Sequence, residues 1–239
     1  MCRRVLITGT SSGIGLAITN QLLAAGHEVW GLSRNPQDNE HPHFHPYAID
    51  LSDLDSLPDE LEPFLEVDAV ICNVGRGQFG NLEEFSYEQI RSLMDLNFLS
   101  HVFLIKKLLP HLKKRERADI VFIGSEASLV GKQKGSIYCA SKFALRGFAQ
   151  SLREECSRSS VHVSMVQPGM VRTPFYDPLG FEPGEDPTQA ILPEDIAEIV
   201  ELILKMRAGT VCDEIVLSPM KKVVQKKTNV SPEGLRIKS

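Results

Sequence analysis

The sequence has few cysteines, and those it has are not grouped. Cys2, Cys72, Cys139, Cys156 and Cys212 are scattered and odd in number, and no Cys-x-x-Cys pair occurs. This spacing argues against a zinc cluster and suits a reducing compartment. We therefore expect a cytoplasmic protein without a metal site.

Long apolar runs and a basic charge excess are also missing. The first apolar run, Val5–Ile7, is too short for a signal peptide, and no run approaches the roughly 20 residues of a membrane span. The net charge of −5 argues against nucleic acid or an anionic membrane as a partner. His41, His43 and His45 alternate in a Pro-rich stretch with no cysteine nearby, which favours a loop or strand over a metal site.

Strand-like runs alternate with helical patterns along the 239 residues. This alternation predicts an α/β fold: one domain, residues 1–220, with a doubly wound parallel sheet of about seven strands and helices on both faces. We expect strands over residues 5–7, 28–33, 47–49, 68–72, 120–123, 161–167 and 212–217. We expect helices from residue 16 and over residues 85–112, 136–156 and 195–206, with a proline-broken helix over 52–65.

A glycine-rich loop, Thr8-Gly-Thr-Ser-Ser-Gly-Ile-Gly15, joins the first strand to the first helix. Glycines let the backbone approach a pyrophosphate, and a helix N-terminus offers it free N–H groups. The spacing of Gly9, Gly13 and Gly15 differs from Gly-x-Gly-x-x-Gly, so a plain tight turn is the alternative. In this strand–loop–helix setting we favour phosphate binding.

The end of the second strand bears on the choice of cofactor. A carboxylate there would bind the ribose 2′-hydroxyl of NAD, but the sequence has Ser33-Arg34. A hydroxyl and a guanidinium suit the 2′-phosphate of NADP. The sequence therefore favours NADP over NAD, with a merely solvated Arg34 as the alternative.

Tyr138 and Lys142 are four residues apart, so they share one face of a predicted helix. A nearby ammonium should lower the pKa of the phenol, and Ser125, at the end of a strand, is placed to hold a carbonyl oxygen. Such a pair alone more often only stabilises a helix. However, the glycine loop, Asp50, Asn73, Ser125 and Pro168-Gly169 all follow strand ends, the edge where ligands bind such sheets.

These motifs resemble those of the short-chain dehydrogenase/reductase family, in its single-domain branch, from Val5 to about Thr173. The resemblance implies a Rossmann-type fold and hydride transfer between NADP and a carbonyl or secondary alcohol. It implies that Ser125 binds the substrate oxygen, that Tyr138 is the general acid/base, and that Lys142 tunes it. It also implies a cofactor site formed by Gly9, Thr10, Ser11, Ser12, Gly13, Ile14, Gly15, Ser33, Arg34, Asp50, Leu51, Asn73, Gly75, Tyr138, Lys142, Pro168, Gly169, Val171 and Thr173.

Asn97 completes the implied catalytic tetrad by positioning a water that links Lys142 to solvent. A buried cap or kink residue is the alternative interpretation. The motif Cys72-Asn-Val-Gly75 departs from the family's Asn-Asn-Ala-Gly, and Leu217-Ser-Pro219 departs from Val-Asp-Gly-Gly. The first departure changes only details of a loop, whereas the second leaves the substrate open.

The substrate side carries less information. Residues 175–193 are rich in proline, glycine and acid, which is typical of a lid. The helix over 196–206 is apolar around most of its circumference, so we expect a homodimer or homotetramer. We expect residues 221–239 to form a polar, basic tail. The alternative function for the whole chain is that of a non-enzymatic protein that binds a dinucleotide as a sensor. By position alone we expect the substrate beside Arg76, Phe79, Glu126, Met170, Phe175 and Tyr176.

Overall fold

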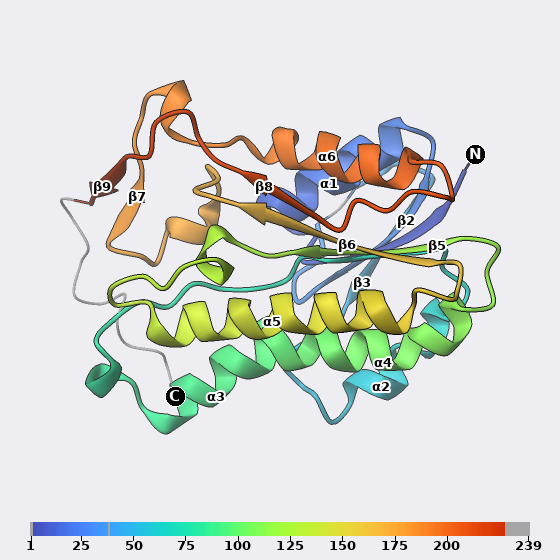
Figure 1. Ribbon diagram of the computed structural model, residues 1–239, viewed down its shortest axis with the longest axis horizontal. Coiled ribbons are helices and arrows are strands. Elements are labelled where there is room, and N and C mark those ends of the chain that lie inside the picture. Colours follow the sequence, from blue (N-terminus) through green and yellow to red (C-terminus); the bar gives the residue numbers. More distant parts are fainter. Residues whose placement is uncertain (1, 38, 228–239) are drawn as a thin grey trace.

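The computed structural model describes residues 2–37 and 39–227. Its central sheet has seven strands, all parallel, in the order β3-β2-β1-β4-β5-β6-β8 (Figure 1). This confirms the predicted doubly wound, Rossmann-type fold, and the chain reverses its direction of winding beside β1. The strands are β1 Arg4–Thr8, β2 Glu28–Ser33, β3 Phe44–Ala48, β4 Ala69–Cys72, β5 Ala118–Ile123, β6 Val161–Pro168 and β8 Glu214–Leu217.

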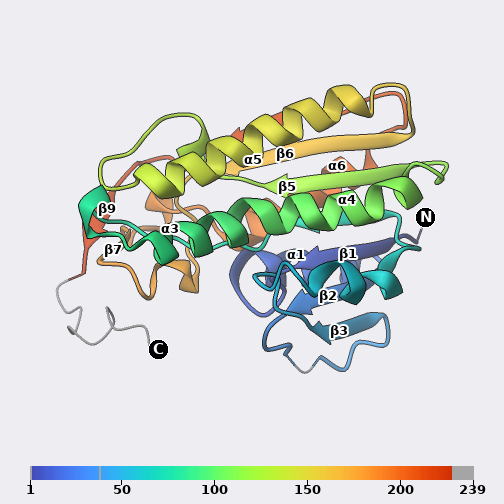
Figure 2. The same ribbon diagram turned by 90° about the horizontal axis from the view of Figure 1, so that it is seen from below.

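Helices cover both faces of this sheet, as Figures 1 and 2 show. The helices α1 (Gly13–Ala24) and α6 (Pro193–Lys205) pack against each other on one face. The other face carries α2 (Leu57–Glu60), α3 (Tyr87–Met94), α4 (Ser100–Leu112) and α5 (Ser136–Glu155).

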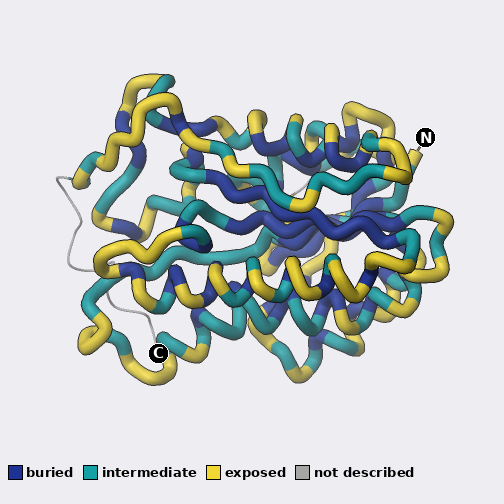
Figure 3. The backbone as a smooth tube through the Cα atoms, in the orientation of Figure 1, coloured by how far each residue is buried: buried dark blue, intermediate teal, exposed yellow. Residues whose placement is uncertain are grey.

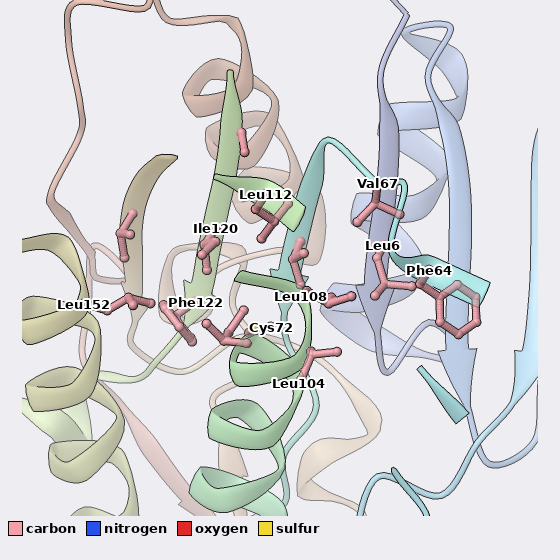
Figure 4. Packing of buried hydrophobic residues seen from close by; sticks show 14 of the residues in the cluster. Leu6, Phe64, Val67, Cys72, Leu104, Leu108, Leu112, Ile120, Phe122 and Leu152 are labelled. Atoms are coloured by element: carbon pink, nitrogen blue, oxygen red, sulfur yellow. The ribbon is translucent and has the colours of Figure 1, made fainter. Parts of the chain in front are cut away.

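Alternating side chains of each strand feed two separate cores. Val5 and Ile7 pack with α1 and α6, whereas Leu6, between them, points to the opposite core with Leu108 and Phe122 (Figure 4). Figure 3 shows the central strands buried beneath both helical layers. The near-continuous apolar runs of these strands follow from burial on both faces.

The predicted continuous helix over 85–112 is wrong in one detail. Between α3 and α4 the chain makes a π-helical turn, Asp95–Leu99, which contains Asn97. The Ser100 hydroxyl donates to the carbonyl oxygen of Leu96 at 2.7 Å within this widened turn. Apolar periodicity cannot reveal such a turn, since one extra residue leaves the pattern on either side intact.

The predicted lid contains a short strand, β7 (Phe181–Pro183), between two 3₁₀ turns, Pro174–Tyr176 and Pro187–Gln189. Strand β7 pairs antiparallel with β9 (Val224–Lys226), apart from the main sheet (Figure 1). The first part of the predicted tail is thus a strand, and residues 228–239 lie outside the described part of the chain. Within residues 2–37 and 39–227, no helix has the length and apolarity needed to span a bilayer.

Candidate functional site

A cleft of about 330 Å³ opens along the carboxyl ends of β1, β2, β4, β5 and β6. Thr10, Gly15 and Asn97 from the predicted site are not among its lining residues and are buried. The cleft brings together the other predicted residues: Gly9, Ser11, Ser12, Gly13, Ile14, Ser33, Arg34, Asp50, Leu51, Asn73, Gly75, Ser125, Tyr138, Lys142, Pro168, Gly169, Val171 and Thr173.

The glycine loop has a backbone that side chains would disrupt. Gly9 and Gly13 have φ angles of +75° and +54°, and a Cβ on Gly15 would lie 2.0 Å from the Gly9 carbonyl oxygen. The Asn73 side chain fixes the loop by donating from Nδ2 to the carbonyl oxygen of Thr8 at 2.9 Å and to that of Gly9 at 3.3 Å. The loop leads into the N-terminus of α1, beside the cleft.

Two arginines line the same cleft: Arg34 directly follows β2, and Arg76 lies in the loop after β4. The pKa of Arg76 is lowered, first because its guanidinium is partly buried and second because the positive charge of Arg34 repels it. Arg76 donates from Nη2 to the Ser92 hydroxyl at 2.8 Å, while its buried Nε has no partner among the described residues. The Ser33 hydroxyl oxygen is likewise buried and unpartnered. Unpaired donors beside two cations are the features of an anion site.

Asp50 contributes the one carboxylate among the cleft's lining residues. Burial opposes its ionisation, but hydrogen bonds from Ser52 and the charge of Arg34 outweigh burial and hold the pKa of Asp50 below its ordinary value. Both the backbone N–H and the hydroxyl of Ser52 donate to Oδ1, at 3.0 and 2.7 Å. The cleft near Arg34 therefore keeps a net positive charge.

Ser125 lies two residues after the end of β5, and its hydroxyl caps the following 3₁₀ turn by accepting from the Ala127 N–H at 3.2 Å. Lys142 lies on α5 with only 4% of its surface exposed, and its Nζ donates to the Ile123 carbonyl oxygen at 3.4 Å. Burial lowers the pKa of Lys142 to about 8. The amine therefore stays mostly protonated at neutral pH, although it gives up its proton more readily than an exposed lysine.

Tyr138 shares this buried surface, with 7% exposure. The expectation that Lys142 lowers the pKa of the phenol is wrong for this structure. Burial raises the pKa of Tyr138 to about 12, and a hydrogen bond with Ser125 offsets only part of that rise. The sequence shows which charge is near the phenol but not how completely its hydroxyl is shielded from water.

Asn97 lies behind the cleft and joins three segments. Its Oδ1 accepts from the backbone N–H of Arg76 at 2.9 Å, and its Nδ2 donates to the Arg76 carbonyl at 3.0 Å and the Ser141 hydroxyl at 3.2 Å. A Cβ on Gly75 would lie 3.3 Å from Asn97 Oδ1 and 3.5 Å from Lys142 Nζ. The absence of that side chain leaves room between the two polar groups.

Gln167, a fully buried residue at the end of β6, was not predicted from the sequence. Its Oε1 accepts from the Ser125 N–H at 2.8 Å, and its Nε2 donates to Glu214 at 2.9 Å. Glu214 in turn accepts two hydrogen bonds from Arg146 on α5. The available signal was an amide in an apolar strand directly before Pro168-Gly169, because a buried amide needs partners.

Of the residues expected beside the substrate, Phe175 and Tyr176 line the cleft, whereas Phe79, Glu126 and Met170 are not among its lining residues. Arg76 also lines the cleft, but its guanidinium lies within reach of the charge of Arg34. Five rings form a closed circuit that we call the aromatic cluster: Phe79, Tyr138, Phe175, Tyr176 and Phe181. Successive ring centroids around the circuit are 5.0, 6.1, 5.2, 5.9 and 5.0 Å apart. Phe181 was not predicted, because a lone Phe in a proline-rich segment carries no pattern.

The sequence matches the short chain dehydrogenase family over residues 3–180. The chain belongs to this family, which confirms the predicted class of protein. Among curated relatives, it is 33% identical to 3-ketodihydrosphingosine reductase of Bacteroides thetaiotaomicron, over 72% of this chain and 65% of the relative. It is 31% identical to estradiol 17-beta-dehydrogenase 1 of Rattus norvegicus, over 75% and 57%. The chain thus spans less than two thirds of these relatives' lengths.

A solved structure of similar size is that of an alcohol dehydrogenase from the archaeon Thermococcus sibiricus, complexed with 5-hydroxy-NADP. It has a TM-score of 0.81 and 26% identity, and the match covers 93% of this chain and 99% of that one. The shared architecture therefore extends beyond the glycine loop to nearly the whole chain.

Proposed function

We propose that the chain is an NADP-dependent oxidoreductase that interconverts a carbonyl compound and a secondary alcohol. The observation that carries this proposal is the juxtaposition of Ser125, Tyr138 and Lys142 in one cleft with the glycine loop. The names of the relatives, which are dehydrogenases and reductases, support the same reaction class.

The cleft fits a phosphorylated dinucleotide. The loop from Gly9 to Ile14 would hold the pyrophosphate at the N-terminus of α1. Ser33, Arg34 and Arg76 would hold the 2′-phosphate, because they combine an unpartnered hydroxyl with two cations. Asp50 and Leu51 would border the adenine, and Asn73, Gly75, Pro168, Gly169, Val171 and Thr173 would line the remainder. When bound, the nicotinamide supplies or accepts the hydride.

Tyr138 is the proton donor in this account. With its pKa raised to about 12, the phenol is protonated at neutral pH, as a general acid must be before it protonates a carbonyl oxygen. The hydroxyl of Ser125 holds the same oxygen, and Lys142 supplies a positive charge that offsets the developing phenolate. Asn97 fixes the backbone of Arg76 and lies beside Lys142, where a bound water would link the amine to solvent.

The family resemblance also supports the proposal of a homodimer or homotetramer. The expectation that α6 is apolar around most of its circumference is wrong, because its outer face carries Glu194, Glu198 and Lys205, but one large apolar side chain is exposed there. Leu202 is 56% exposed on α6, and Val216 is 49% exposed on the edge strand β8. A second copy of the chain would cover both. Sedimentation of the purified protein measures the number of subunits directly.

The reaction is tested by mixing the protein with NADPH or NADH and a panel of carbonyl compounds. We expect oxidation of NADPH that depends on the carbonyl compound, with weaker use of NADH. Tight NADPH binding without turnover of any carbonyl or alcohol would instead favour the dinucleotide sensor.

A further inference from the structure

The aromatic cluster lies at the reactive end of the cleft. Tyr138 belongs to both, and its ring contacts Phe79 and Phe175 directly. Phe79, Phe175 and Phe181 are only half-buried, unlike the core rings Phe64 and Phe122, which are at most 1% exposed. An aromatic surface is therefore available beside the phenol.

The charges around the cluster are already paired. Glu126 accepts from Lys132 at 3.4 Å and from Lys222 at 3.1 Å. Lys227 donates from Nζ to the carbonyl oxygens of Tyr176 and Asp177, at 2.6 and 3.3 Å. An anionic substrate would have to break one of these pairs, whereas an apolar substrate leaves them intact.

The C-terminal segment holds the cluster in place. Phe181 pairs with Lys226 in the β7–β9 ladder, and the backbone N–H of Lys227 donates to the Gly180 carbonyl at 3.1 Å. Lys221 makes a similar bond to Thr188 at 2.8 Å. Rings fixed in this way lose little freedom when a ligand packs against them.

We propose that the aromatic cluster is the substrate-recognition site and that it selects flat, apolar carbonyl compounds carrying a ring system. Such a ring packs against Phe175 and Tyr176, which line the cleft, while its carbonyl oxygen meets Tyr138 and Ser125. Phe79 and Phe181 in turn pack against the lining rings Tyr138 and Tyr176. This inference rests on the proposed function and narrows it to one substrate class.

The test compares acetonaphthone, a flat aromatic ketone, with acetone and with pyruvate, in the wild type and in Phe175→Ala and Tyr176→Ala. Turnover is followed by NADPH oxidation, and binding of acetonaphthone is measured by calorimetry with NADP⁺ present. Phe143→Ala is the matched control, because Phe143 is a 43% exposed ring on α5 outside the cluster.

We expect acetonaphthone to give the highest kcat/KM. Each cluster variant should lose about 10-fold in kcat/KM for it and little for acetone, since one ring contact is removed. Higher kcat/KM for pyruvate, or equal losses for both ketones, would overturn the proposal. If no carbonyl is reduced but acetonaphthone binding still depends on Phe175, the proposed function fails while the recognition site stands. Absence of that binding would overturn the site itself.

Discussion

The side-chain oxygen of Gln167 accepts a hydrogen bond from the backbone N–H of Ser125 at 2.8 Å. Through this contact the buried end of β6 fixes the loop that carries the Ser125 hydroxyl. The same amide reaches Glu214, which Arg146 holds from α5. The position of Ser125 therefore depends on three residues outside the motif that identifies it.

Replacing Gln167 by Met should lower kcat more than it raises KM, because it misplaces the Ser125 hydroxyl. It should also lower the free energy of unfolding by about 1–3 kcal/mol, since a buried N–H loses its acceptor. Steady-state kinetics and urea unfolding measure both effects. Gln150→Met, on the exposed face of α5, is the control, and an unchanged kcat in Gln167→Met would contradict the positioning role.

Lys142 predicts an unusual dependence of stability on pH. Its pKa falls from an ordinary 10.5 to about 8 on folding, so between those values the unfolded chain binds more protons and raising the pH stabilises the fold. This lowering of the Lys142 pKa corresponds to about 3 kcal/mol of folding stability that is missing at pH 7. Lys142→Met should therefore be more stable than the wild type at pH 7, and the difference should shrink towards pH 10.

Urea unfolding of both proteins without cofactor, between pH 7 and pH 9.5, measures this difference. The range stays below the titration of Tyr138. The effect of Tyr138 has the opposite sign between pH 10 and 12, because the folded phenol keeps a proton that the unfolded one loses. A difference that is constant with pH would contradict the burial of a charged Lys142.

If Arg34 and Arg76 hold the 2′-phosphate, replacing either should weaken the binding of ligands that carry this phosphate and of no others. Arg34→Met and Arg76→Met should each weaken binding of 2′,5′-ADP by about 10-fold or more, because a charge-assisted contact to the 2′-phosphate is lost. Binding of 5′-ADP, which lacks that phosphate, should change little. Calorimetry measures both ligands, with Arg91→Met on the exposed side of α3 as control. If both variants lost the same affinity for 2′,5′-ADP and for 5′-ADP, the arginines would not be contacts of the 2′-phosphate.

The ammonium of Lys227 should help to hold the predicted lid, residues 175–193, in place. Lys227→Met keeps the length of the side chain but removes the bonds to the carbonyl oxygens of Tyr176 and Asp177. Amide hydrogen exchange over residues 176–182 should become faster. Lys226→Met, whose side chain is exposed in β9, should leave that exchange unchanged. Equal exchange in both variants would show that the ladder alone holds the lid.

The parts of the site that the sequence predicts are those set by local spacing. Tyr138 and Lys142 share a helix face, and the glycines of the loop have fixed offsets from a strand and a helix. The parallel sheet follows from the alternation of elements, because parallel strands need crossover helices. The family match and the sheet confirm that level of description.

The parts that the sequence does not predict depend on contacts between distant segments. Phe79 meets Phe181, and β7 meets β9, through pairings too short to leave a hydrophobic period. Gln167 is recognisable only once its partner Ser125 is known. The predicted lowering of the Tyr138 pKa was wrong for a related reason. Sequence spacing reveals a neighbouring charge, whereas the burial that raises this pKa depends on the whole fold.

In the proposed reaction, Tyr138 donates the proton to a carbonyl compound that NADPH reduces. The most direct test is Tyr138→Phe, with the 88% exposed Tyr87→Phe as control. We predict unchanged NADPH affinity and a loss of about 100-fold or more in carbonyl-dependent NADPH oxidation, the usual contribution of a general acid. Wild-type rates of NADPH oxidation in Tyr138→Phe would contradict the account.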